Sequence, residues 1–337
     1  MNENFRVPRG YKPLLDVQQT ERAIKLIKDY FERSLSAELR LFRVTSPLFV
    51  PKGSGINDDL NGIEQPVQFA VTSLGGRTME IVQSLAKWKR MALADYGYSQ
   101  GTGIYTDMNA LRPDDQVDQI HSVYVDQWDW ELVISPQDRS ETLLETIVRS
   151  IYQSIRRTEF VVHEQYPQIE LILPPEITFI SSSEALERFP DLSPEQREKQ
   201  LAKEYKAVFI SRIGWPLSDG RPHGGRAPDY DDWSLNGDII VWDPLRQDSL
   251  ELSSMGIRVD IPALEKQLHH SGQEHRKDLY WHMRLIAGDF PQTIGGGIGQ
   301  SRLCMFLLRK AHIGEVQAGV WPELQVQALS EMGVTLM

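Results

Sequence analysis

The sequence has a single cysteine and no long hydrophobic run. Cys304 is the one cysteine in 337 residues, which excludes an internal disulfide. No apolar stretch approaches the ~18 residues that a membrane-spanning helix needs. The N-terminus, MNENFRVPRGYKPLL, lacks the apolar core of a secretion signal. These features predict a cytoplasmic protein that does not bind membranes.

Long basic segments are also missing. Aspartate and glutamate number 47 against 36 lysines and arginines, which gives a net charge of −11. The sequence has no basic arm and no Lys/Arg stripe interleaved with aromatic residues, so we expect no nucleic-acid partner. A site for a polyanion needs only a few well-placed cations, which an acidic chain can still supply.

Several catalytic motifs are absent from the sequence. His163-Glu164 does not continue into HExxH, no His/Cys cluster has zinc spacing, and no Gly-x-Ser-x-Gly elbow occurs. Residue 2 is Asn2, and Cys304 falls in an apolar helical pattern. The chain therefore lacks an N-terminal cysteine nucleophile that releases ammonia from glutamine. If the reaction needs a nitrogen donor, we expect free ammonia.

Hydrophobic spacing predicts an α+β fold, with a mostly antiparallel sheet flanked by helices, because strands and helices mix without regular βαβ alternation. We expect a single catalytic domain over residues 1–337, with residues 1–16 as a leader. Helices are predicted at 17–39, 85–96, 141–165, 261–269, 273–287 and 300–308. Strands are predicted at 41–50 (an edge strand containing Pro47), 67–72 and 79–83 (a hairpin turning at Gly75-Gly76), 121–134, 177–180, 207–213, 238–242 and 249–257.

One predicted strand carries a row of polar residues. Alternate residues of a strand share a face, so Gln127, Asp129 and Glu131 point the same way. The opposite face carries Asp126, Trp128 and Trp130. An amide and two carboxylates in a row suit the ammonium group of an amino acid. The alternative is a solvated sheet face.

A glycine run, 295–299, precedes Arg302. It predicts a flexible turn leading into a helix whose first turn carries the arginine, an arrangement that suits an anion or an adenine ring. The run matches neither a Walker loop nor a dinucleotide fingerprint. The alternative is a plain tight turn.

Three further stretches suggest chemistry but also have ordinary interpretations. Ser84 and Lys89 lie where a predicted strand meets a helix and could bind a ligand there. The alternative is an ordinary basic helix surface. Arg112 precedes a proline, which places it on an extended stretch or a turn. Taken alone, it is an ordinary surface arginine. Carboxylates between residues 226 and 251 suit Mg²⁺ or ammonium, but a solvated loop is the alternative.

The order of these stretches resembles the three motifs of class II aminoacyl-tRNA synthetase cores. Arg112 resembles the arginine of motif two, and Arg302 that of motif three. Within this superfamily the chain closely resembles the asparagine synthetase A family of aspartate–ammonia ligases. The similar segments cover nearly the whole chain and include 84–90, 111–114, 121–131, 226–239, 251–259 and 291–303. At Ser234-Leu235 the chain departs from the family, where other members have a longer loop.

The resemblance implies a two-step synthesis of L-asparagine. The β-carboxylate of L-aspartate attacks the α-phosphate of ATP to give β-aspartyl-AMP and pyrophosphate, and ammonia then displaces AMP. By resemblance, the catalytic residues are Arg112, Lys89, Asp58 and Asp231. Either of the two aspartates binds ammonium or accepts its proton, and the sequence does not choose between them.

The resemblance also assigns binding residues. Aspartate would be held by Ser84, Gln127, Asp129, Glu131, Ser254 and Arg258. ATP would contact Arg112, Asp238, Arg302 and Gly297. Mg²⁺ would bind Glu251 and Asp238.

The early helix and the proline-containing strand resemble the dimer-forming motif of the family, which predicts a homodimer. Two alternatives remain open. One is a class II synthetase-like enzyme that loads another acceptor, although the chain is acidic and lacks an anticodon-binding domain. The other is a non-catalytic binding paralogue, although both motif arginines are present.

Overall fold

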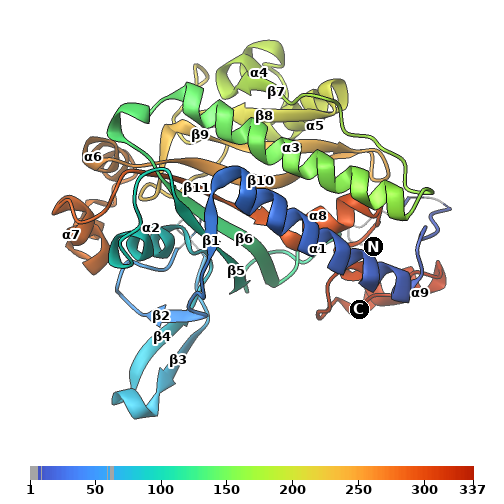
Figure 1. Cartoon of the computed structure of the whole chain (residues 1–337), viewed down its shortest axis with the longest axis horizontal. Helices are drawn as coiled ribbons and strands as arrows, with labels where there is room; N and C mark the ends of the chain where they lie inside the picture. Colours follow the sequence, from blue (N-terminus) through green and yellow to red (C-terminus); the bar gives the residue numbers. More distant parts are fainter. Residues whose placement is uncertain (1–6, 9, 59, 61–63) are drawn as a thin grey trace.

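The protein, described here as a computed structural model covering residues 7, 8, 10–58, 60 and 64–337, is built on an eight-stranded sheet (Figure 1). The strand order is β1 (Leu41–Arg43), β5 (Gly103–Leu111), β6 (Tyr124–Val133), β11 (Thr293–Gly299), β10 (Asp248–Arg258), β9 (Asp231–Asp243), β8 (Ala207–Ser211) and β7 (Thr178–Ser181). The pairs from β5 to β8 are antiparallel, and parallel pairs lie at the two edges. The predicted α+β class with a mostly antiparallel sheet is confirmed.

Two long helices cover one face of this sheet, α1 (Val17–Leu39) and α3 (Glu141–Gln165) (Figure 1). Both match their predicted bounds. Asp16 caps α1 by accepting a hydrogen bond from the Gln19 backbone N–H, and the Gln19 side-chain oxygen accepts one from the Asp16 backbone N–H. The apolar face of α1 packs on the sheet, and Phe31 lies 4.7 Å from Trp128, ring centre to ring centre.

A second group of helices packs beside β5 and β6. It contains α2 (Ala86–Asp95), α6 (Ile261–His270) and α7 (Tyr280–Ile286). The single helix predicted over 273–287 is wrong. A 3₁₀ turn, Glu274–Asp278, ends at Leu279, whose extended backbone separates it from α7. The remaining helices are α4 (Ser182–Arg188), α5 (Pro194–Tyr205), α8 (Gln300–Leu307) and α9 (Glu323–Glu331).

A small three-stranded sheet projects from the main body (Figure 1, cyan). Its strands are β2 (Phe49–Pro51), β4 (Arg77–Ile81) and β3 (Gln68–Val71). The single strand predicted over 41–50 is therefore wrong, because β1 and β2 belong to different sheets and Pro47 lies between them. The Gly75-Gly76 turn is confirmed, since both glycines have positive φ.

The glycine run is a central strand and not a turn, which corrects the prediction. β11 pairs with β6 on one side and β10 on the other. Its glycines make room for neighbours: a β-carbon on Gly296 would lie 2.6 Å from that of Met255. Helix α8 follows immediately, as predicted.

None of the helices in the described part of the chain has the length and apolar character needed to cross a bilayer. Of the predicted leader, residues 1–6 and 9 lie outside the described residues. Further along it, Leu15 is buried, and the hydroxyl of Tyr11 donates to the Glu315 carboxylate at 3.0 Å.

Candidate active site

A cavity of about 360 Å³ lies over the central strands β6, β11 and β10. Most of the residues predicted for the site line it, although they come from distant parts of the sequence. They are Asp58, Ser84, Lys89, Arg112, Gln127, Asp129, Asp231, Glu251, Ser254, Arg258, Gly297 and Arg302. The structure thus brings together segments from the first, middle and last thirds of the chain.

The polar row of β6 faces this cavity. Gln127 and Asp129 line it, while Trp128 and Trp130 are fully buried in the core on the opposite side of the sheet. The predicted alternation is confirmed. The glycines of β11 leave space for the row, since a β-carbon on Gly297 would lie 2.4 Å from Oε1 of Gln127.

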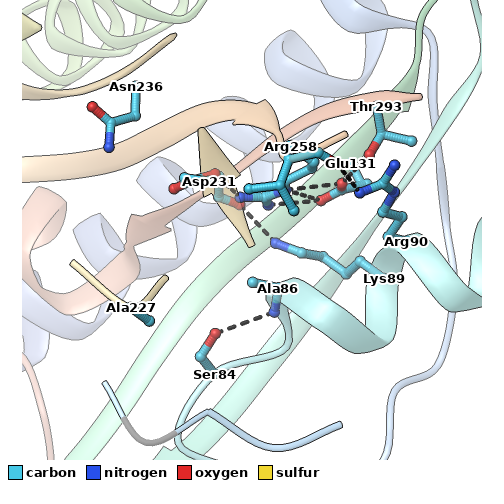
Figure 2. Close-up of polar contacts among 12 residues, drawn as sticks. Ser84, Ala86, Lys89, Arg90, Glu131, Ala227, Asp231, Asn236, Arg258 and Thr293 are labelled. Carbon is cyan, nitrogen blue, oxygen red and sulfur yellow. Dashed lines mark hydrogen bonds and ion pairs between the residues drawn. The ribbon is translucent and has the colours of Figure 1, made fainter. Parts of the chain in front are cut away.

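Glu131, the third member of the row, lies under the cavity and is absent from its described lining. It binds Arg258, with Nε to Oε1 at 2.9 Å and Nη2 to Oε2 at 2.7 Å. Thr293 donates a further hydrogen bond at 2.7 Å. Arg258 also pairs with Asp231, so this arginine lies between two carboxylates (Figure 2). The predicted contact of Glu131 with aspartate stays a prediction, and in this structure the Glu131 carboxylate contacts Arg258.

Burial and charge act differently on the two carboxylates of this network. Burial alone would raise the pKa of Glu131, but the Arg258 charge and its hydrogen bonds hold that pKa below its usual range. Burial outweighs Arg258 at Asp231, whose pKa is raised. Asp231 is therefore the better proton acceptor of the two near neutral pH.

Lys89 reaches from α2 to the cavity floor (Figure 2). Its ammonium group pairs with Asp129 and donates to the Gly296 carbonyl at 2.9 Å. Burial lowers the pKa of Lys89, although the Asp129 charge opposes this. Oδ2 of Asp129 is buried and has no hydrogen-bond partner among the described residues. That oxygen is available to an incoming ammonium group.

Ser84 and Arg112 form another wall. The Ser84 hydroxyl accepts a hydrogen bond from the Ala86 backbone at 3.1 Å (Figure 2). Arg112 donates to the Gln83 carbonyl at 3.1 and 3.2 Å. The Gln83 side chain donates in turn to the Asp58 carbonyl at 3.0 Å. Arg112 and Asp58 are therefore linked through a single residue.

Carboxylates and arginines alternate at the end of the cavity near α8. Arg302, in the first turn of α8, lies 3.7 Å from Oε2 of Glu251. Asp238 pairs with Arg226 and is absent from the described lining, and its contact with ATP stays a prediction. Burial, with a contribution from the Glu251 charge, raises the pKa of Asp238 to about 6.

Glu251 and Asp238 are suitable as Mg²⁺ ligands. They lie on adjacent strands, and Oδ1 of Asp238 is buried without a hydrogen-bond partner in the described chain. No group of three or more His, Cys, Asp or Glu residues within the described ranges could hold a metal. Two carboxylates are enough, because Mg²⁺ often binds one or two carboxylates together with substrate phosphates.

Sequence reasoning missed several side chains that line the cavity, among them Arg226 and Tyr230. Both fall in the stretch between residues 226 and 251, where the carboxylates carried the prediction. Burial and the nearby charges of Asp58 and Asp231 raise the pKa of Tyr230 well above its usual range. A neutral phenol therefore lies close to both candidate ammonium-binding carboxylates.

Solved structures with the same architecture are class II synthetases. Asparaginyl-tRNA synthetase from Pyrococcus horikoshii, complexed with asparaginyl-adenylate, matches with a TM-score of 0.65 and 15% identity, over 90% of this chain and 70% of that one. The enzyme of the same name from Entamoeba histolytica matches with a TM-score of 0.63 and 16% identity, over 89% and 66% of the two chains. The fold is that of the class II aminoacyl-tRNA synthetases.

Sequence comparison identifies the family. The family model for aspartate-ammonia ligase matches residues 18–333. The aspartate–ammonia ligase of Bacteroides fragilis is 55% identical over 98% of both chains. That of Clostridium perfringens is 54% identical over 99% of this chain and all of its own. The chain therefore belongs to the aspartate–ammonia ligase family.

Proposed function

We propose that the protein makes L-asparagine from L-aspartate, ATP and free ammonia, releasing AMP and pyrophosphate. The main support for this proposal is the 55% identity, over nearly the whole chain, to a protein named aspartate–ammonia ligase. The cavity supports the proposal, because it combines cations for phosphate with a carboxylate row for an amino acid.

In the first step, the β-carboxylate of aspartate attacks the α-phosphorus of ATP, and pyrophosphate leaves with the bonding electrons. Both reactants are anions, so cations must bring them together. Arg112 would bridge the α-phosphate and the attacking carboxylate, with Lys89 beside it and Arg302 on the nucleotide. The product would be β-aspartyl-AMP.

The aspartate substrate would be oriented by the polar row and its neighbours. Oδ2 of Asp129 is the proposed acceptor for the substrate ammonium group, with Gln127 and Ser84 alongside. Ser254 and Arg258 line the same cavity and would contact the substrate carboxylate. Glu131 would act by holding Arg258 in place.

In the second step, ammonia attacks the activated acyl carbon, and AMP leaves with the electrons of the broken bond. Ammonium must first lose a proton to become a nucleophile. Asp231 is the proposed acceptor, because its raised pKa favours protonation. Asp58, also in the cavity lining, would bind the ammonium ion.

Mg²⁺ is proposed to be held by Glu251 and Asp238. When bound, it would neutralise phosphate charge on ATP. Arg302 and Arg226, which pair with these carboxylates here, would then be free to turn towards the nucleotide.

We propose that the whole chain forms one catalytic domain, since the main sheet takes strands from residue 41 to residue 299. A homodimer is proposed because the α1–β1 region resembles the family's dimer motif. The cytoplasm, where ATP, aspartate and ammonia are available, is the proposed compartment.

One assay tests the reaction. Purified protein receives aspartate, ATP, Mg²⁺ and ammonium, with and without tRNA. Asparagine and AMP in equal amounts without tRNA support the proposal. AMP formation that needs tRNA would indicate an enzyme loading another acceptor, and no AMP under any condition would indicate a binding paralogue.

A further inference from the structure

A buried charged cluster lies behind the cavity wall and has no role in the chemistry above. Its centre is the Asp229 carboxylate. Oδ2 of Asp229 accepts hydrogen bonds from Lys87 Nζ at 3.1 Å, Arg276 Nη1 at 2.8 Å and His282 Nε2 at 2.9 Å. All four side chains are buried, and Asp229 and His282 are completely inaccessible.

The cluster joins three parts of the structure that carry cavity residues. Lys87 lies on α2, two positions before Lys89. Asp229 lies two positions before Asp231. His282 lies on α7, which contacts the loop that carries Asp58.

The contact between α7 and the Asp58 loop is close. The Trp281 backbone N–H donates to the Ser54 carbonyl at 3.1 Å. A β-carbon on Gly55 would lie only 2.9 Å from both Nδ1 of His282 and the β-carbon of Leu279. The loop therefore rests directly on the imidazole ring, three residues before Asp58.

A second hydrogen bond joins α7 to α2. The indole N–H of Trp281 donates to the Lys87 carbonyl at 2.7 Å. Helices α7 and α2 are thus joined both through Asp229 and through this bond. The loop that carries Asp58, helix α2 and the segment that carries Asp231 are therefore all connected around the Asp229 carboxylate.

The Asp229 carboxylate faces two cations, Lys87 and Arg276, and the imidazole of His282. Burial alone would raise the pKa of Asp229, but Lys87, His282 and Arg276 hold that pKa well below its usual range. Burial lowers the pKa of His282, so its imidazole is neutral and Nε2 acts as a hydrogen-bond donor. Oδ1 of Asp229 and Nδ1 of His282 are buried without a hydrogen-bond partner in the described part of the chain, so the three bonds to Oδ2 are the ones that hold the joined elements together.

We propose that Asp229 and His282 are positioning residues that set the spacing between Asp58 and Asp231, and so fix the ammonium-binding end of the cavity. This proposal rests on the proposed function. The nucleotide end, around Arg302, is built on α8 and β10, and this cluster contains no residue from either element. Loss of the cluster should therefore weaken ammonium use more than ATP use.

The test compares His282→Leu, which removes the donor, with His282→Gln, whose amide nitrogen can replace Nε2. We expect the KM for ammonium to rise about tenfold in His282→Leu, with the KM for ATP within twofold, and His282→Gln to recover most of the loss. The matched control is Arg284→Ala. It removes an ion pair of 2.7 Å with Asp95, between the same two helices, and one of 3.3 Å with Asp289, and should change neither constant.

Hydrogen exchange of residues 54–58 and 226–231 gives a second measurement that does not need activity. We expect faster exchange in His282→Leu and unchanged exchange in Arg284→Ala. Equal losses for ammonium and ATP, or unchanged exchange, would overturn the proposal. If His282→Leu does not fold, His282→Phe replaces it. If the wild type makes no asparagine, the proposed function fails, and the exchange result still decides on the cluster.

Discussion

Gly295 stands directly opposite Glu131 in the central sheet, and a β-carbon on Gly295 would lie 2.0 Å from Oε2 of that carboxylate. The same atom would lie 2.5 Å from Nη2 of Arg258. The buried ion pair therefore occupies the space that a side chain on β11 would need. In this strand, glycine is needed because it leaves room for the charged side chains beside it. It is not needed for backbone flexibility.

Gly295→Ala should destabilise the protein strongly. The new methyl group must displace the Glu131–Arg258 pair, and overpacking of a core costs about 1–3 kcal/mol. Urea unfolding should show a loss near the upper end of that range. Gly224→Ala is the control, since its nearest neighbour, Ile213, would lie at 3.4 Å. A fully stable Gly295→Ala protein would show that the sheet can widen at this point.

Glu131→Gln tests whether Glu131 acts through Arg258. The substitution keeps the shape but removes the charge, and breaking a buried ion pair costs roughly 3–5 kcal/mol. We expect reduced stability in urea unfolding together with a raised KM for aspartate, because Arg258 lines the cavity. An unchanged KM for aspartate in the folded variant would leave Glu131 with a purely structural role.

Most secondary structure could be predicted from local patterns. Helices over 17–39 and 141–165 follow the 3.6-residue spacing of apolar residues, and polar caps mark where they begin. The two faces of β6 could be assigned because strands alternate. The class II synthetase-like fold was predicted from the order of motifs, which local propensity alone does not provide.

The errors have a common physical origin, which is tertiary context. No local feature of the glycine run shows that Glu131 lies opposite it on the neighbouring strand β6. The run was therefore predicted to be a turn. The split at Leu279 depends on contacts that α7 makes elsewhere. The Asp229 cluster joins residues up to 195 positions apart, from Lys87 to His282, and no spacing rule predicts such a set.

Arg112→Ala should greatly slow catalysis. Removing one preorganised group that stabilises developing charge typically costs 10²–10³-fold in kcat, or about 3 kcal/mol. Initial rates of asparagine formation at saturating substrates measure this loss. Arg188→Ala, which removes an exposed pair with Glu204 at 2.8 Å, should leave kcat unchanged. Full activity in Arg112→Ala would contradict the assigned role.

Cys304 should be unreactive in the native protein. Its side chain is buried on α8, and burial raises the pKa of the thiol to about 12. The thiolate is the reactive form, so at pH 8 the native protein presents almost none of it. Iodoacetamide followed by mass spectrometry should modify Cys304 only after unfolding. Rapid modification of the folded protein would show that α8 opens readily.

The proposed homodimer should depend on exposed apolar residues of the segment from β1 to β2, the first strand of the small sheet. Phe42, Leu48 and Phe49 are 58%, 51% and 43% exposed, an unusual concentration of large apolar side chains in eight residues. Leu48→Glu places a charge among them and should convert the dimer to a monomer. Sedimentation equilibrium should give twice the 38.6 kDa chain mass for the wild type and that chain mass for the variant. Leu324→Glu, at a 77% exposed position on α9, is the control and should remain dimeric. A wild-type monomer would refute the dimer, and a dimeric Leu48→Glu would place its interface elsewhere.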